Sequence, residues 1–322
     1  MVKFSLGTDP EFMLSKNGKI YSAIGIVKGT KDRRKKIGKH AFYYDNVLAE
    51  AAVAPGFTKK EAIDNIGECL KLYAQLVAPY RLEAKASHDY PVDQLKHKDS
   101  FKIGCDPEAC AYSGMVIEPD EQLFLKTNLR SAGGHIHLGC KDLLKDHPIL
   151  SNYAQTVSIF LMDLFLGIPS ILLDHDPTTK QRKQLYGQAG RWRFPPYGVE
   201  YRSMGNFWLS SPKLVSLVYD ISEFVLDLLV TDRWQSLWTV DVEQLNDREA
   251  WSRFDFHPSK CFNCVGYDVK SVRNAIDAMD VKAGNKIMQD IVRQYMPNDL
   301  YDEILKLTTA KEFDLHTEWK IA

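Results

Sequence analysis

The sequence predicts an α+β fold, with a mixed or antiparallel sheet and helices on one side of it. Strand-like and helical segments do not alternate as they do in repeated strand–helix–strand units. No linker rich in Gly, Ser or Pro divides the 322 residues, and the candidate polar residues are spread from position 9 to position 202. A site assembled from so much of the chain indicates one main domain, residues 1–240, with a mostly helical extension at 241–322 packed on it.

The first third of the chain is predicted to form strands and then one helix. The first 55 residues are typical of strands and hairpins, with turn signals at SKNGK and VKGTKDRRKKIGKH. A helix follows to about residue 79, with Thr58 as its N-cap. The apolar residues at helical spacing in it are Ile63, Ile66, Leu70, Tyr73 and Leu76.

The rest of the chain is predicted to mix short strands with longer helices. Strands are expected at KIGCDPEACA, AGGHIHLG and YGVEYRSMG, and helices at 148–166, 212–231 and 269–295. The most apolar stretch, 157–173, carries Asp163 and is interrupted by Gly167 and Pro169. It falls short of the ~20 apolar residues that span a bilayer, so we predict a buried helix and a turn, with no membrane anchor.

Charge and cysteine content exclude some classes of protein. Lys and Arg total 41 against 42 Asp and Glu, so the excess positive charge of a general nucleic-acid binder is missing. Six cysteines are too sparse for a disulfide scaffold, and the N-terminus does not resemble a signal peptide, which predicts a cytoplasmic protein with reduced thiols. Cys261 and Cys264 form a lone CxxC without the second ligand pair that a structural zinc site normally has.

The motif Gly-x-Asp-Pro-Glu occurs twice, as GTDPE at 7–11 and as GCDPE at 104–108. On a strand, Asp9 and Glu11 share one face about 7 Å apart, and Asp106 and Glu108 do the same. The proline between them predicts an edge strand or a strand end that faces a cleft. Solvated strand faces with Asp-Pro turns are the alternative for either copy alone, and the repetition favours a shared role.

Three further segments place polar groups in pairs. GGHIHLG puts His135 and His137 on one strand face, and GVEYR does the same with Glu200 and Arg202. Core histidines and a simple ion pair are the alternative interpretations. YDNVLAEAAVAP adds two acidic residues, Asp45 and Glu50.

Convergence of these carboxylates would require bound cations, because unneutralised acids in one site repel one another. Oxygen-rich ligation with an imidazole suits Mg²⁺ or Mn²⁺, and Mg²⁺ commonly accompanies nucleotide phosphates. Arg182, Arg193 and Arg202 could donate to those phosphates. The sequence contains no Walker-type loop.

Four segments resemble the phage-encoded amidoligases of the carboxylate-amine ligase type 2 group, which are related to glutamate-cysteine ligase and glutamine synthetase. The segments are GTDPEF, DNVLAE, AGGHIHLG and QRKQLYGQAGRWRFPPYGVEYRSMGNFW, and the similarity runs from residue 5 to about residue 210. The resemblance implies a curved, largely antiparallel, glutamine-synthetase-like sheet with helices on its convex side. It also implies ATP and two or three Mg²⁺ ions on the concave face of a catalytic domain at 1–240.

The resemblance also implies roles for individual residues. Metal binding is implied for Asp9, Glu11, Glu50, His135 and Glu200. His137 corresponds to a nucleotide-side histidine and Arg202 to a phosphate-contacting arginine, while Arg182 and Arg193 would face phosphate or the substrate carboxylate. Asp9 departs from the family pattern, since glutamate-cysteine ligases have Glu there and Asp reaches less far.

Other candidates complete the predicted site. Lys31 belongs to a basic segment that could close over phosphates or an acidic substrate, or could be a solvated turn, and we assign it to nucleotide binding. Substrate binding is assigned to Asp45, Asp106, Glu108 and Tyr186.

The predicted function is ATP- and Mg²⁺-dependent joining of a carboxylate to an amine through an acyl phosphate. The substrates would be small molecules or peptides, and the oligomeric state stays open. One alternative is a metal-dependent hydrolase that uses His135, His137, Asp106 and Asp176. The other is a non-catalytic nucleotide-binding or virion-associated protein with the same fold.

Overall fold

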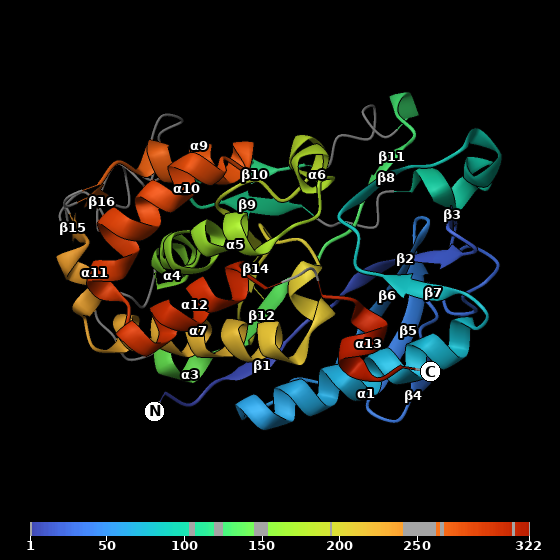
Figure 1. The fold of residues 1–322 in the computed structure, drawn as a ribbon, viewed down its shortest axis with the longest axis horizontal. Coiled ribbons are helices and arrows are strands. Elements are labelled where there is room, and N and C mark those ends of the chain that lie inside the picture. The colour runs from blue at the N-terminus through green and yellow to red at the C-terminus, as the bar shows by residue number, and fades with distance from the viewer. Residues whose placement is uncertain are drawn as a thin grey trace.

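The structure, a computed structural model, describes residues 2–102, 107–118, 125–144, 154–193, 195–240, 262–264, 267–310 and 313–321. Helices and strands are mixed along the chain, and the named strands all pair antiparallel. The predicted α+β class is therefore confirmed. In Figure 1 the strands β2, β5 and β6 gather on the right beside α1, while most other helices lie on the left.

The first large sheet has the strand order β1-β12-β14-β13-β9-β10. Its strands are β1 (Ser5–Gly7), β12 (Ile136–Gly139), β14 (Gly198–Tyr201), β13 (Arg191–Arg193), β9 (Glu108–Cys110) and β10 (Val116–Ile117). In the register, Gly7 lies opposite His137, His137 opposite Glu200, and Glu200 opposite Arg193, so one line carries polar side chains on three neighbouring strands, β12, β14 and β13. The neighbouring line, Leu6, Leu138 and Val199, is buried on the other face.

The second large sheet has the order β3-β2-β6-β5-β4, with β7 also paired to β2. Its strands are β2 (Glu11–Lys16), β3 (Lys19–Tyr21), β4 (Lys35–Ile37), β5 (His40–Asp45), β6 (Leu48–Ala52) and β7 (Arg81–Glu83). Glu11 lies opposite Glu50 and Glu50 opposite Tyr43, which makes a second polar line. Phe42 points the other way and packs edge-on against Tyr73 of the helix α1.

The two sheets meet at the first Gly-x-Asp-Pro-Glu motif. Strand β1 ends at Gly7 and β2 begins at Glu11, so Asp9 lies between strands of different sheets. The prediction that Asp9 and Glu11 share one face of one strand is wrong in this respect. Pro10 has no N–H to donate, and only its carbonyl pairs onward, with Ala51 N at 3.1 Å, which permits the change of sheet.

Besides the two large sheets and the longer helices, the described residues form two small sheets and four short 3₁₀ turns. The small sheets pair β8 (Ser87–Asp89) with β11 (Leu129–Ser131) and β15 (Trp238–Val240) with β16 (Phe262–Cys264). The 3₁₀ turns are Val92–Leu95, Lys98–Phe101, Phe207–Ser210 and Arg233–Ser236.

Two long helices are close to their predicted ranges. Helix α1 (Lys59–Val77) begins after Thr58, whose side-chain oxygen accepts a hydrogen bond from Glu61 N as an N-cap does. Helix α7 (Pro212–Val230) is capped by Ser211 and has proline in its first turn, where a missing N–H needs no partner. The shorter helices α3 (Lys141–Leu144), α6 (Thr179–Leu185), α12 (Asn298–Thr308) and α13 (Leu315–Trp319) fill the remaining positions.

Two predicted helical segments differ from the structure in their interruptions. The segment 269–295 divides into α9 (Val269–Ala278), α10 (Val281–Ile287), a π-helical turn and α11 (Arg293–Tyr295). The break occurs because Met279 has a positive φ of 49° and Asp280 then caps α10. The expected turn at Gly167 and Pro169 is wrong: α4 (Ala154–Met162) continues through a π-helical turn, Asp163–Gly167, into α5 (Ile168–Leu173).

The π-helical turn explains how the helix passes the proline. It widens the helix just before Pro169, which then occupies the first turn of α5, where its missing N–H costs little. Thr156–Leu173 is long and apolar enough to cross a membrane, but the whole segment is buried inside the molecule. This agrees with the prediction of a core helix.

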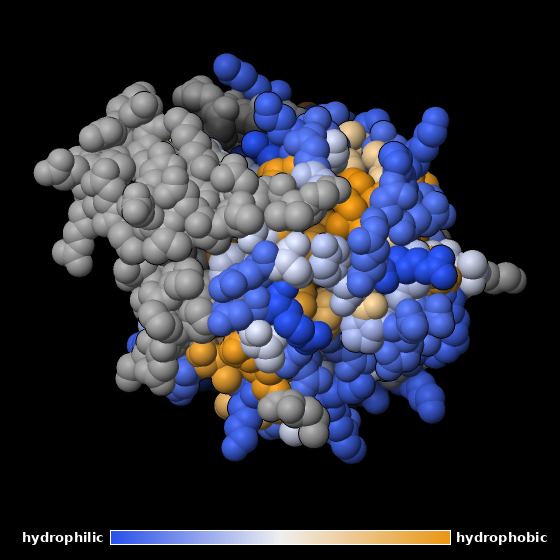
Figure 2. All heavy atoms as spheres, turned by 90° about the vertical axis from the view of Figure 1, so that its left-hand side faces the viewer, coloured by the Kyte–Doolittle hydropathy of each residue, from blue (hydrophilic) through white to orange (hydrophobic). Residues whose placement is uncertain are grey.

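One main hydrophobic core joins the helices to the sheets. It runs from Phe12 and Leu138 in the strands to Val225 in α7, and the C-terminal helices add Ile276 and Ile304. On the end of the molecule that faces left in Figure 1, polar side chains alternate with small apolar areas (Figure 2). The polar lines of both sheets lie on the faces away from this core, where a site can form.

Candidate active site

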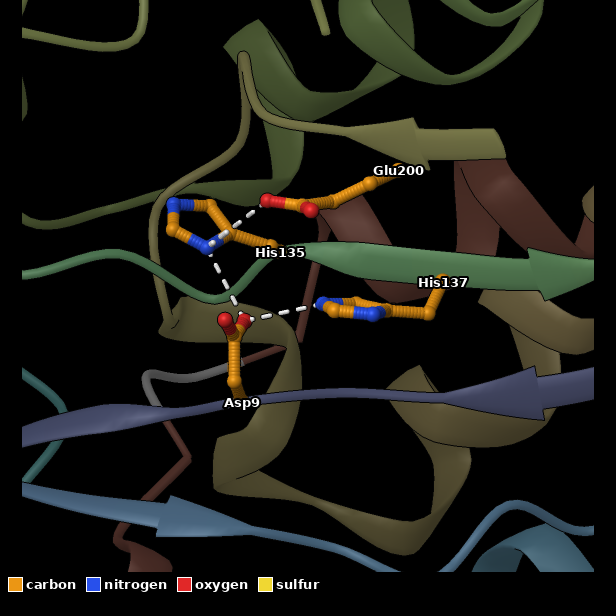
Figure 3. Close-up of side chains that lie close together, drawn as sticks. All are labelled: Asp9, His135, His137 and Glu200. Carbon is orange, nitrogen blue, oxygen red and sulfur yellow. Dashed lines mark hydrogen bonds and ion pairs between the residues drawn. The ribbon is translucent and has the colours of Figure 1, made fainter. Parts of the chain in front are cut away.

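Four side chains from three segments form the first ligand group. Asp9 comes from the junction of the two sheets, His135 and His137 from β12 and the residues before it, and Glu200 from β14. One ligand atom from each lies within 4.8 Å of every other. Figure 3 shows both imidazoles close to Asp9, whose Oδ1 is 2.9 Å from His135 Nδ1 and 3.1 Å from His137 Nε2. The Glu200 carboxylate points to His135, with its Oε1 3.8 Å from the same Nδ1.

Glycines allow the chain before β12 to approach its neighbours closely. A Cβ on Gly134 would lie 2.8 Å from the Asn206 Cα and 2.9 Å from the Trp208 Nε1, so a larger residue does not fit. Trp208 Nε1 donates to the Gly134 carbonyl at 2.9 Å, and Gly133 N donates to Glu11 Oε2 at 2.5 Å. The close backbone approach predicted from the glycines of AGGHIHLG is confirmed at Gly134, and these contacts help to hold His135 next to Asp9.

The two histidines have different protonation preferences. Burial and the Arg202 guanidinium lower the pKa of His135 to about 3, which keeps its ring neutral and able to bind a metal. Burial alone would lower the pKa of His137 as well, but the Asp9 carboxylate outweighs it and raises that pKa. The pKa of Asp9 is held well below its usual range by the two histidines, although burial opposes this.

The second ligand group consists of Glu11, Asp45 and Glu50, again with ligand atoms within 4.8 Å of one another. Tyr43 donates to Glu50 Oε1 at 2.8 Å, and Lys31 Nζ lies 2.7 Å from Asp45 Oδ2. Glu50 is 4 % exposed, and its Oε2 has no hydrogen-bond partner among the described residues.

The electrostatics of this second group favour a bound cation. Burial, together with Asp45, raises the pKa of Glu11 to about 7. Burial also raises the pKa of Glu50 well above its usual value, which Lys31 only partly offsets. Ionised carboxylates in this position are therefore under-neutralised by the protein itself.

Arg202 connects the first ligand group to the second copy of the repeated motif. Its guanidinium is fully buried, with Nε 2.9 Å from Glu108 Oε2, and it also contacts Glu200 and the hydroxyl of Tyr186. Tyr186 in turn lies 3.3 Å from His135 Nε2. Arg193 Nη1 lies 3.7 Å from Glu200 Oε1. The site thus combines carboxylates and imidazoles with guanidinium groups, a composition suited to metal ions and anionic substrates.

Residues 127–321 match the family model described as "Phage phiEco32-like COOH.NH2 ligase-type 2". The matched residues make up more than half of the chain. The chain belongs to this ligase family. The resemblance predicted from the motifs is confirmed, and the protein is a carboxylate-amine ligase. The match includes His135, Glu200 and Arg202, and it extends through the C-terminal helices, where the sequence offered no motif. No curated protein gives a significant match to the chain.

Arg182 does not occupy the position in the ligase that the prediction assigned to it. Its side chain is fully buried and donates to backbone carbonyls of Ala132 at 2.8 Å, Ser203 at 3.1 Å and Met204 at 2.8 Å. A guanidinium used in this way holds three chain segments together, and its hydrogen bonds within the described residues go to backbone carbonyls and not to the carboxylates of the ligand groups. Spacing along the sequence could not reveal this, because the carbonyls come from distant loops.

One candidate of the hydrolase alternative, Asp176, does not join the ligand groups. Asp176 accepts hydrogen bonds from Ala86 N at 2.6 Å and from Thr178 N at 2.8 Å, so it orders a loop. It lines a cleft of about 910 Å³, which none of the ligand-group residues lines. Asp106 and Cys261 lie outside the described residues, and β16 ends at Cys264.

Sequence reasoning missed several residues that lie at the site. Two of them, Tyr43 and Arg191, can be assigned to the site only from the strand register. Tyr43 lies opposite Glu50. Arg191 lies opposite a residue of β9, and its Nη1 is 3.4 Å from Glu108 Oε1. Tyr197 hydrogen-bonds His137 Nδ1 at 2.5 Å and stacks on its ring. The PPYG turn before β14 was the one available signal for Tyr197, and it did not point to a contact with His137.

Proposed function

We propose that this ligase uses ATP and Mg²⁺, or Mn²⁺, to join a carboxylate to an amine as an amide or isopeptide bond through an acyl phosphate. The observation that carries the proposal is the pair of adjacent ligand groups joined by the segment Asp9–Glu11. Together they supply five carboxylates and two imidazoles. An ATP-dependent ligase needs such a cation site next to phosphate-binding arginines.

The residues present fit divalent metal ions. Oxygen-rich donor sets favour Mg²⁺ and Mn²⁺, and the neutral His135 supplies a nitrogen ligand. The buried Glu50 Oε2, which has no hydrogen-bond partner in the described part of the chain, is the kind of atom that a metal ion would satisfy. Asp9, His135 and Glu200 would hold one ion, and Glu11 with Glu50 another. Asp45, which the sequence assigned to substrate, lies with the second group.

The reaction follows from the groups around this site. An oxygen of the substrate carboxylate attacks the γ-phosphorus of ATP, and the bond to ADP breaks. The amine nitrogen then attacks the carbonyl carbon, phosphate leaves with that oxygen, and the nitrogen loses a proton. Arg202 and Arg193 would donate to the phosphoryl oxygens, where negative charge accumulates. Bound metal ions would supply further neutralisation of this charge.

The remaining assignments belong to the same proposal. His137, held as a cation against Asp9, would contact the nucleotide, and Lys31 would reach its phosphates. Glu108 and Tyr186 would orient Arg202 and the substrate, since both contact its guanidinium. The carboxylate and the amine would be small molecules or peptide groups in the cytoplasm. Nucleic acid and membrane are not among the proposed partners.

Isotope transfer tests this mechanism directly. Mass spectrometry of host extract incubated with ATP, with and without the protein, identifies the joined product and hence both substrates. Substrate labelled with ¹⁸O in its carboxylate should then yield ¹⁸O-phosphate, together with ADP. Glu200→Ala and Arg202→Ala should abolish ADP release, whereas Arg233→Ala, at an exposed arginine paired with Asp227, should not. Unchanged turnover in both site variants, or activity with zinc in the absence of ATP, would contradict the proposal.

A further inference from the structure

Lys31 links the basic segment to the second ligand group. Its Nζ lies 2.7 Å from Asp45 Oδ2, and the side chain is 38 % exposed while that of Asp45 is 10 % exposed. The backbone beside it is attached to β5, since Tyr44 N donates to the Gly29 carbonyl at 3.0 Å. The ammonium group therefore reaches from an exposed segment onto a largely buried carboxylate.

The second ligand group needs more positive charge than the described protein atoms around it supply. Three carboxylates meet within 4.8 Å, and their described hydrogen-bond donors include neutral groups, the Tyr43 hydroxyl and the Gly133 N–H. The Lys31 ammonium forms an ion pair with Asp45 of the group. One oxygen, Glu50 Oε2, is buried without a hydrogen-bond partner among the described residues.

A metal ion and the Lys31 ammonium compete for Asp45 Oδ2 in this arrangement. An ion bound to Asp45 Oδ2 at about 2.1 Å would lie within about 5 Å of an ammonium group 2.7 Å from the same oxygen. Two like charges so close inside a partly buried site repel each other strongly. The carboxylate therefore has two competing cations, one from the chain and one from solution.

We propose that the Lys31 ammonium occupies the place of a divalent cation in the group of Glu11, Asp45 and Glu50, and that metal binding displaces it from Asp45. This inference rests on the proposed function, because it uses the metal assignment made there. The displaced ammonium is then available to the phosphates of the nucleotide. Metal binding thereby prepares the nucleotide site, and without metal Lys31 neutralises part of the charge of the acidic group.

The rest of the basic segment supports this arrangement. Arg34 lies over the Tyr43 ring at 4.5 Å, and the Tyr43 hydroxyl donates to Glu50, so a second cation of the segment also contacts the surroundings of the group. Lys36 is exposed on β4 and does not pair with any of the three carboxylates. Loss of the contact at Asp45 would loosen the residues around Lys31, which lie between the contact of Gly29 with β5 and the start of β4 at Lys35.

Mn²⁺ affinity in the absence of nucleotide tests the displacement. Lys31→Met should bind Mn²⁺ at least tenfold more tightly than the wild type, measured by isothermal titration calorimetry and by the electron paramagnetic resonance signal of free Mn²⁺. Lys36→Met, from the same segment, should bind like the wild type. Adding Glu50→Gln to Lys31→Met should remove the gain, which assigns it to this group. Equal or weaker binding by Lys31→Met overturns the inference and leaves the ligase proposal intact, whereas absence of binding in every variant contradicts the metal assignment itself.

Limited trypsin digestion gives a second readout that a purely structural lysine would not produce. Mn²⁺ alone should speed cleavage within residues 28–39 of the wild type, and addition of a non-hydrolysable ATP analogue should slow it again. In Lys31→Met the cleavage rate at the remaining basic residues should not respond to Mn²⁺. Protection of the segment by Mn²⁺ alone would overturn the inference.

Discussion

Glu11→Gln should make the metal-free protein more stable at neutral pH. Glu11 is the first residue of β2. Burial, together with the charge of the nearby Asp45, raises the pKa of its carboxyl from 4.5 to about 7. A carboxyl whose pKa is raised by folding binds its proton more tightly in the folded state than in the unfolded state. The free energy of unfolding therefore falls as the pH rises from about 4.5 to about 7, where the folded protein must also release the proton.

The size of this effect follows from the shift. A rise of the pKa from 4.5 to about 7 corresponds to about 3 kcal/mol at ~1.4 kcal/mol per pKa unit. Glutamine carries no charge at any pH, and its side-chain carbonyl can still accept the hydrogen bond from Gly133 N. The stability difference between Glu11→Gln and the wild type should thus be small at pH 4.5 and reach about 3 kcal/mol in favour of the variant at pH 7.

Urea denaturation in EDTA between pH 4.5 and pH 7 measures the stability difference between Glu11→Gln and the wild type. The control is Glu303→Gln, which removes the charge of a solvent-exposed glutamate paired with Lys306. Saturating Mg²⁺ should remove most of this difference at pH 7, because a ligand at 100 times its Kd stabilises the wild type by about 2.7 kcal/mol and the variant lacks one metal ligand. A stability difference that stays flat between pH 4.5 and pH 7 would refute the reasoning.

Two further substitutions separate structural from catalytic arginine contacts. Arg182→Met should lower the free energy of unfolding by at least about 3 kcal/mol, because it leaves the buried carbonyls of Ala132, Ser203 and Met204 without their donor. Urea denaturation measures this loss. A variant that is as stable as the wild type but inactive would contradict the structural role of Arg182. Glu108→Gln should lower kcat about tenfold or more, because the ion pair that orients Arg202 is lost, and should also lower the free energy of unfolding, because the buried guanidinium loses a charged partner. A kcat equal to that of the exposed-site control Glu118→Gln would contradict this expectation.

The parts of the fold that depend on local pattern could be predicted from the sequence. Thr58 and the apolar spacing after it define α1, and alternation places Leu138 in the core and His137 on the opposite face. The convergence of Asp9, His135 and Glu200 was expected from residue type and family resemblance. The structure brings these side chains together, while their role as metal ligands stays a prediction.

The parts that depend on distant partners could not be predicted. Nothing within QRKQLYGQAG distinguishes a phosphate-binding arginine from Arg182, whose acceptors lie at residues 132, 203 and 204. The contact between Asp45 and Lys31 likewise requires the fold of the basic segment against β5. The continuous helix through Pro169 depends on a π-helical turn, which no periodicity of 3.6 residues describes.

The repeated Gly-x-Asp-Pro-Glu illustrates how one local signal can serve two purposes. In both copies the glutamate is the first residue of a strand, Glu11 in β2 and Glu108 in β9, because the preceding proline cannot donate to a ladder and pairing resumes after it. A strand start places the carboxylate at the rim of its sheet in each case. The partners then differ: Glu11 lies with Asp45 and Glu50, whereas Glu108 pairs with Arg202. The motif therefore specifies that a carboxylate stands at the start of a strand. The residues of the neighbouring strands determine its role. Among other acids the carboxylate needs a cation, and beside a guanidinium it orients that group.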